Sequence, residues 1–273
     1  SKRQLKAAAM LVEEVERRTG VRWRVAASAE GARASVIVGL RNEVAALAGV
    51  TPPASPGPEG YSNGVNAAAA RVYIAGADDR GVLFGVGHLL RSLDLRRGRV
   101  TLDAAYSITT APETKLRGHQ LGYRPKPNSY DGWDIPQWQQ YIRDLIVFGT
   151  NAVELIPPRS DDDADSPHFP RPQMEMMIAM SRILDEYGLD VWVWYPAMDE
   201  DYSKPDTVEF ALREWGEVFR QLPRLDAVLV PAGDPGHTPA PILMPFLEKQ
   251  SANLKKYHPN ATMWLAPQGF DQK

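Results

Sequence analysis

Residues 137–156 read QWQQYIRDLIVFGTNAVELI and contain a helical pattern followed by a strand pattern. The first part places apolar residues three and four positions apart, as on one face of an amphipathic helix, and Gly149 follows as a stop signal. The second part, from Ala152 to Ile156, is a short apolar run of strand length. A helix that leads directly into a buried strand is typical of a parallel sheet, because parallel strands need crossover connections.

The same helix and strand patterns alternate on both sides of this segment. Strands are predicted at 116–123, 152–156, 191–195, 227–230 and 262–266, and helices at 137–148, 173–187, 207–221 and 242–257. This alternation is compatible with a (β/α)8 barrel and with an open doubly wound sheet. The barrel is favoured, because each strand ends in a polar or Pro/Gly-rich loop with reactive side chains, where barrel enzymes build their active sites.

A smaller α/β domain is predicted before this alternating block. Helical patterns lie at 3–18, 42–48 and 81–93, and strand patterns at 21–26, 35–38, 71–75 and 99–102. The prolines and glycines of TPPASPGPEGYSNG, residues 51–64, predict a loop within it. The polar segment TTAPETK, residues 109–115, separates the two patterns. We therefore expect an N-terminal domain at 1–112 and a barrel domain at 113–273.

The barrel domain contains five predicted strands, whereas a closed barrel has eight and typically about 250 residues. An incomplete barrel leaves the last apolar strand as an unpaired edge, which promotes aggregation unless another segment covers it. We expect the remaining strands to come from a further segment of the same polypeptide or from a second chain.

Composition excludes several classes of function. The chain of 273 residues has 31 Lys and Arg against 34 Asp and Glu, a net charge of −3, and this balance argues against a nucleic-acid partner. No apolar stretch has the length of a membrane span, so no membrane partner is expected. The absence of cysteine excludes disulfides, thiolate metal sites and thiol nucleophiles. No metal-binding spacing such as HExxH is present, and no cofactor is expected.

Three segments of the first domain carry a resemblance to a known family. They are EGY at 59–61, RVYIAG at 71–76 and DRGVLFGVGHLLRSL at 79–93. Together they resemble the small α/β domain that precedes the catalytic barrel in family 20 β-hexosaminidases and that glycoside hydrolase families 67 and 84 share. In physical terms they are a strand, a turn and a helix whose glycines permit close packing on the sheet.

Four segments of the second domain resemble successive strands of the family 20 barrel, in the same order. They are LRGHQLGYR at 116–124, FGTNAVELIPPRSDDD at 148–163, YPAMD at 195–199 and PAGDPGH at 231–237. The resemblance implies a glycosidase with a carbohydrate substrate, and a periplasmic or secreted location. It also implies that Arg117 holds sugar hydroxyls at the first strand.

The sequence departs from the family pattern at the catalytic pair. In family 20 an Asp orients the acetamido group of the substrate, and the adjacent Glu is the general acid. Asp234 matches the Asp, but Pro235 stands at the position of the Glu and cannot transfer a proton. Ser203 stands near the position where the family has a histidine. A divergent glycosidase is the leading hypothesis, and a non-catalytic carbohydrate-binding or scaffold protein with a degenerate hydrolase fold is the alternative.

Glycoside hydrolysis usually needs two carboxyl groups, and Asp234, Glu154 and Asp199 are the candidates. Glu154 lies in an apolar strand, where an ionised carboxylate is costly unless an arginine such as Arg117 or Arg124 pairs with it. Asp199 begins an acidic run whose like charges would raise the pKa of one member toward that of an acid catalyst. The alternative for this run is a solvated loop.

Seven further residues are candidates for contacting the sugar. Aromatic faces stack on sugar C–H surfaces, and polar groups at strand ends bind hydroxyls. The alternatives are a solvated loop for Asp162, hydrogen-bonded structural histidines, and core packing for the tryptophan. The candidates are Arg117, His119, Arg124, Asp162, His237, Trp264 and Gln268.

Overall fold

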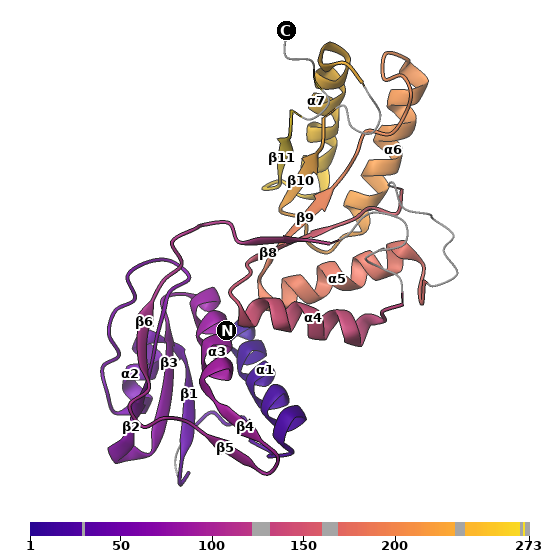
Figure 1. The fold of residues 1–273 in the computed structure, drawn as a ribbon. Coiled ribbons are helices and arrows are strands. Elements are labelled where there is room, and N and C mark those ends of the chain that lie inside the picture. The colour runs from indigo at the N-terminus through magenta and orange to yellow at the C-terminus, as the bar shows by residue number, and fades with distance from the viewer. Residues whose placement is uncertain (29–30, 122–131, 160–168, 233–237, 268–269, 271–273) are drawn as a thin grey trace. The chain divides into compact units, whose positions relative to one another are not determined.

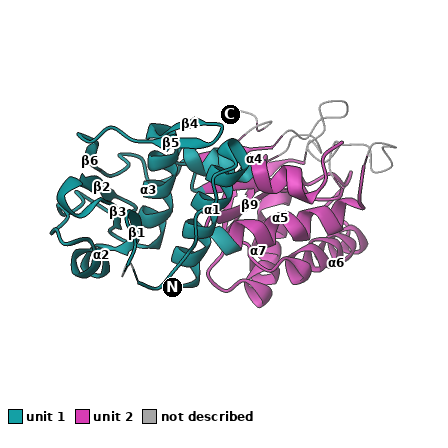
Figure 2. Ribbon diagram, turned by 90° about the horizontal axis from the view of Figure 1, so that it is seen from below, with its two compact units in different colours: residues 1–117, 141–151, 186–188 teal, residues 118–140, 152–185, 189–273 magenta. Residues whose placement is uncertain are grey.

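A computed structural model describes residues 1–28, 31–121, 132–159, 169–232, 238–267 and 270. The chain forms two compact units (Figure 2). Unit 1 comprises residues 1–117, 141–151 and 186–188, and unit 2 comprises residues 118–140, 152–185 and 189–273. The predicted domain boundary after residue 112 stays a prediction.

Unit 1 contains a four-stranded mixed sheet in the order β1-β3-β2-β6 (Figure 1). Strands β1 and β3 are parallel, whereas β2 is antiparallel to both β3 and β6. The strands are β1 (Ser35–Leu40), β2 (Tyr61–Asn66), β3 (Arg71–Gly76) and β6 (Ser107–Thr110), and a separate hairpin pairs β4 (Asp94–Arg96) with β5 (Arg99–Thr101). The helices are α1 (Lys2–Thr19), α2 (Arg41–Ala48) and α3 (Asp79–Ser92), with a short 3-10 helix at Ala67–Ala69.

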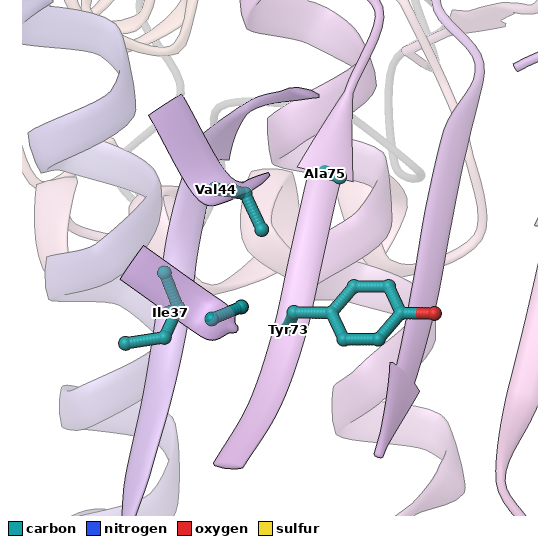
Figure 3. Packing of buried hydrophobic residues seen from close by; sticks show 5 residues of the cluster. Ile37, Val44, Tyr73 and Ala75 are labelled. Carbon is teal, nitrogen blue, oxygen red and sulfur yellow. The ribbon is translucent and has the colours of Figure 1, made fainter. Parts of the chain in front are cut away.

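Helices cover both faces of this sheet. On one face Ile37, Tyr73 and Ala75 form a buried cluster with Val44 of α2 (Figure 3). On the other face α3 approaches closely at Gly85, where an added Cβ would lie 2.6 Å from a methyl group of Ile74. The expectation that glycines allow this helix to pack on the sheet is therefore confirmed.

Strand assignments in unit 1 differ from the sequence predictions in two places. The strand predicted at 21–26 is wrong, since these residues form no strand and Val25 is 54% exposed. Strand β2 was missed because its first four residues, YSNG at 61–64, resemble a turn and were included in the predicted loop at 51–64. Two of its polar side chains form hydrogen bonds inside the fold: Ser62 Oγ bonds Thr109 Oγ1 at 3.0 Å, and Asn63 Nδ2 donates to Gly85 O at 2.8 Å.

Unit 2 contains five parallel strands in the order β11-β10-β9-β8-β7, of which Figure 1 labels β8 to β11. They are β7 (Gly118–Gln120), β8 (Ala152–Leu155), β9 (Asp190–Trp194), β10 (Ala227–Val230) and β11 (Thr262–Leu265). The connecting helices are α4 (Ile135–Val147), α5 (Gln173–Tyr187), α6 (Pro205–Gln221) and α7 (Ala240–Tyr257). The final parts of α4 and α5 belong to unit 1.

The strand order separates the two architectures that the sequence left open. Each new strand lies beside the preceding one, as in a (β/α)8 barrel, whereas a doubly wound sheet reverses direction at a switch point. The predicted fold class is confirmed: an α/β chain with a small N-terminal domain, followed by five strands of an incomplete barrel. Across the described residues, no helix combines the length and the apolar character needed to cross a bilayer.

Candidate functional site

The two faces of the unit 2 sheet differ in chemistry. One face carries the fully buried Val153, Val191 and Val228, and Tyr195 continues it into a stack on Trp215 of α6, at 4.0 Å between ring centroids. Helices therefore cover this face. We call the opposite one the inner face, because in a barrel it is turned toward the axis. The strand register places two rows of side chains on the inner face. The first row is Gln120, Glu154, Trp192, Ala227 and Thr262. The next row contains Trp194, Leu229 and Trp264.

Glu154 is the carboxyl group of this row. It lies on β8, between the edge strand β7 and β9, and only 9% of it is exposed. Burial raises its pKa to about 7, and a hydrogen bond from the Gln120 side chain acts in the opposite direction. The structural alternative for Glu154 was a salt bridge to Arg117 or Arg124; the described hydrogen-bond partner is instead the neutral amide of Gln120, and Arg124 lies outside the described residues. A carboxyl group with this pKa can both give and accept a proton near neutral pH.

Aromatic rings lie next to Glu154 on the inner face. Trp192 is its register neighbour on β9, and the Trp192 and Trp264 rings lie 5.5 Å apart between centroids, tilted by 40°. Trp264 is 53% exposed, and its indole N–H donates to Thr262 Oγ1 at 2.9 Å. The predicted core-packing alternative for Trp264 does not fit this exposure. The two rings present an apolar surface suited to a sugar ring.

Asp199 belongs to a different cluster, which follows β8 and β9. Arg159 donates to Asp199 Oδ1 at 2.7 Å and to Glu214 Oε2 at 2.9 Å. The Tyr202 hydroxyl donates to Asp199 Oδ2 at 3.1 Å. Burial raises the pKa of Glu214, and the Arg159 hydrogen bond opposes this effect. Both carboxylates thus share one guanidinium, so Asp199 is held in place by its neighbours.

The rest of the acidic run after β9 is a solvated loop. The expectation of a raised pKa within the run does not hold for Asp201, whose pKa is lowered by hydrogen bonds from Ser203. Glu200 is exposed. Within the part of the chain that the structure describes, His, Asp and Glu side chains nowhere gather in threes as a metal site would require.

Arg117 lies at the amino end of β7, within unit 1, and its side chain is engaged there. It donates to Glu59 Oε2 at 2.6 Å, to Gly149 O at 2.7 Å and to Thr114 O at 2.8 Å. Active sites of barrels lie at the opposite, carboxyl ends of the strands. These contacts favour a structural role for Arg117, in place of the sugar contact that the resemblance implies.

Glu59 is the centre of that structural network. Its carboxylate also accepts from Arg80 Nη1 at 2.9 Å and from Asn151 Nδ2 at 3.2 Å. Burial acts to raise the pKa of Glu59, but the hydrogen bonds from Arg80 and Arg117 outweigh it and the pKa is lowered. The network ties the loop before β2 to the chain segments that lead into β7 and β8.

The remaining predicted site residues divide into two groups. His119 is on β7, in register with Val153 and therefore on the face opposite to Glu154, and burial lowers its pKa. The others lie outside the described residues: Asp234, Arg124, Asp162, His237 and Gln268, together with Pro235. Their predicted roles stay predictions.

Sequence reasoning missed Gln120, Arg159, Glu214 and Glu59. The alternation of side chains along a strand assigns Gln120 to the face opposite to His119, but the pairing of Gln120 with Glu154 depends on the register between β7 and β8. Arg159 and Glu214 are far apart in the chain and look like ordinary surface charges. No local pattern marks them.

Comparisons with known proteins give a consistent fold. No family model matches the sequence, and no curated protein matches it either. Among solved structures, a mutant β-hexosaminidase of Streptomyces plicatus in complex with its product GlcNAc has a TM-score of 0.68 at 16% identity, over 97% of this chain and 59% of that one. The chitobiase of Flavobacterium johnsoniae gives 0.66 at 14% identity, over 97% and 47%. A GH138 enzyme targeting pectin rhamnogalacturonan II gives 0.66 at 15% identity, over 99% and 44%.

The chain thus spans about half the length of these structures. At this identity the likeness concerns the fold. This chain shares the fold of the matched parts of these glycoside hydrolases, and its own sheets and strand order consist of an N-terminal α/β unit followed by five successive parallel strands.

Proposed function

We propose that this chain is part of a glycoside hydrolase that cleaves a carbohydrate by carboxyl acid/base chemistry on the inner face. The observation that carries the proposal is Glu154, a buried carboxyl group whose pKa is about 7, next to Trp192. At neutral pH a large fraction of such groups is protonated and can donate to the leaving oxygen of a glycosidic bond. Trp192 and Trp264 supply an apolar surface for the sugar ring.

A second carboxyl group must stabilise or attack the sugar, or activate water. We propose Asp234 for this role, since it follows β10 in the chain and active-site groups of barrels follow their strands. Asp199 is the alternative, but Arg159 and Tyr202 already occupy both of its oxygens.

The substrates to try first come from the similar structures. The Streptomyces enzyme holds GlcNAc as its product, and the GH138 enzyme targets rhamnogalacturonan II. The panel therefore contains aryl N-acetylglucosaminides, aryl glycosides of neutral sugars, aryl glucuronides and pectin oligosaccharides, incubated with the full-length protein.

The test compares Glu154→Gln and Asp234→Asn with Glu209→Gln, an exposed glutamate of α6 that pairs with Arg213. We expect both site variants to lose about 10²-fold to 10⁴-fold in rate and the control to keep its rate. No hydrolysis of any substrate, or an unchanged rate in Glu154→Gln, would refute the proposal. Calorimetric binding of an oligosaccharide without any release of product would instead favour the non-catalytic carbohydrate-binding alternative.

A further inference from the structure

Gln120 is the inner-face neighbour of Glu154 on the side opposite to Trp192. The two residues are register partners in the β7–β8 pair, and Leu121 N donates to Glu154 O at 3.2 Å just beyond them. The Gln120 side chain forms a hydrogen bond with the Glu154 carboxyl group. Main-chain and side-chain contacts thus fix the two residues to each other.

We propose that Gln120 is a positioning residue for Glu154: its amide donates to the carboxyl group and holds it on the inner face beside Trp192. The inference rests on the proposed function, in which Glu154 transfers a proton. A primary amide donates through its N–H groups and carries no charge. Gln120 therefore orients the carboxyl group of Glu154 without neutralising its charge. An arginine in the same place would neutralise it.

Among the residues that the structure describes, few charged groups lie in the strands next to this pair. On β9, Asp190 shares the face of Trp192 but is paired with Arg224 at 3.0 Å, and on β7 His119 occupies the opposite face. The same row on β10 and β11 carries Ala227 and Thr262, which do not titrate. Among the described residues, burial and the Gln120 amide are the two influences on the protonation of Glu154.

Removing the amide donor has a definite consequence. The N–H group stabilises the ionised carboxylate more than the neutral acid, so its loss raises the pKa of Glu154. Gln120→Met keeps the length of the side chain and removes the donor. We expect the titration midpoint of Glu154 to rise by roughly one pH unit in this variant, the scale of a single hydrogen bond to a charged group.

The experiment is a ¹³C NMR titration of the full chain with labelled glutamate, in which Glu154→Gln identifies the resonance. Gln221→Met is the matched control, because it makes the same substitution at the end of α6, where the side chain bonds Glu217. We expect the midpoint to rise in Gln120→Met and to stay in place in the control. If Gln120→Met does not fold, Gln120→Glu tests the same contact, since a second carboxyl group there also raises the midpoint.

An unchanged Glu154 midpoint in the folded variants would overturn the inference, even if Glu154→Gln abolishes hydrolysis. With an active substrate, the limb of the pH–rate profile that Glu154→Gln removes should move upward in Gln120→Met by the same amount as the NMR midpoint. A limb that stays in place while the midpoint moves would also overturn the positioning role. Failure to hydrolyse any sugar refutes the proposed function and leaves the NMR comparison intact, so the two failures are distinguishable.

Discussion

Replacing Glu154 by glutamine should make the protein more stable at alkaline pH. In the folded chain burial raises the pKa of this carboxyl group from 4.5 to about 7, whereas in the unfolded chain the group is exposed to water. A raised pKa means that the folded state prefers the neutral acid. Below about pH 4.5 both states are protonated and folding carries no cost from this group. As the pH rises toward 7 the unfolded chain ionises first, and stability is progressively lost.

The size of the effect follows from the difference of about 2.5 pH units, which corresponds to about 3 kcal/mol of unfolding free energy once both states are ionised. Glutamine has nearly the same shape, can still bond Gln120 and carries no charge. Relative to the natural chain, Glu154→Gln should therefore change stability little at pH 4.5 and add up to about 3 kcal/mol at pH 8.

Urea unfolding of the natural chain and of Glu154→Gln at both pH values measures how the stability difference between the two proteins changes with pH. The titration of all other groups is common to both proteins and cancels. Glu209→Gln, on the exposed surface of α6, is the control and should show no such difference between the two pH values. A Glu154→Gln variant that gains nothing at pH 8 relative to pH 4.5 would show that Glu154 is ionised and solvated in the folded protein, and the argument for its role as an acid would fail.

Two other predictions follow from the contacts. Glu59→Ala leaves Arg80 and Arg117, both half-buried, without their shared carboxylate and should lower the free energy of unfolding by about 3 kcal/mol. Urea unfolding measures this change, with Glu113→Ala at an exposed position as the control. Equal effects of the two substitutions would contradict the network. Trp264→Ala should weaken saccharide binding about tenfold, measured by calorimetry, and should cost little stability because the residue is 53% exposed. The control Tyr257→Ala, on α7, should leave the affinity for the saccharide unchanged. Equal affinities of the two variants would remove Trp264 from the site.

Four strands of unit 2 could be predicted closely because each is a short apolar run that follows a helical pattern. The interval predicted at 227–230 matches β10, those at 152–156 and 262–266 extend one residue beyond β8 and β11, and that at 191–195 is shifted by one residue from β9. The interval predicted at 116–123 begins two residues before β7, and its last two residues lie outside the described residues. The prediction at 21–26 failed because alternation alone does not supply a neighbouring strand. Strand β2 was missed because its polar residues find partners, such as Thr109, that are distant in sequence.

The site was predictable only where a residue was unusual in its local context. Glu154 was recognisable as a carboxyl group within an apolar strand, and its burial is confirmed. Gln120 and Arg159 could not be recognised from their local sequence. Gln120 pairs with Glu154 on the neighbouring strand, and Arg159, in a loop, pairs with Glu214 of α6. For Arg117 the resemblance implied a sugar contact, which stays a prediction, and no local pattern pointed to the hydrogen bond that its guanidinium donates to Glu59.

The row from Gln120 to Thr262 takes one side chain from each of five successive strands, which four helices connect; each strand is here called a module. Neighbouring modules are joined there by main-chain bonds, which do not depend on the identity of the side chains. A mutation at one of these positions can therefore alter the chemistry of the inner face without disturbing the hydrogen-bond ladder that supports it. A scaffold of this kind therefore allows a reactive group to be lost from one strand and gained on the next without a change of fold.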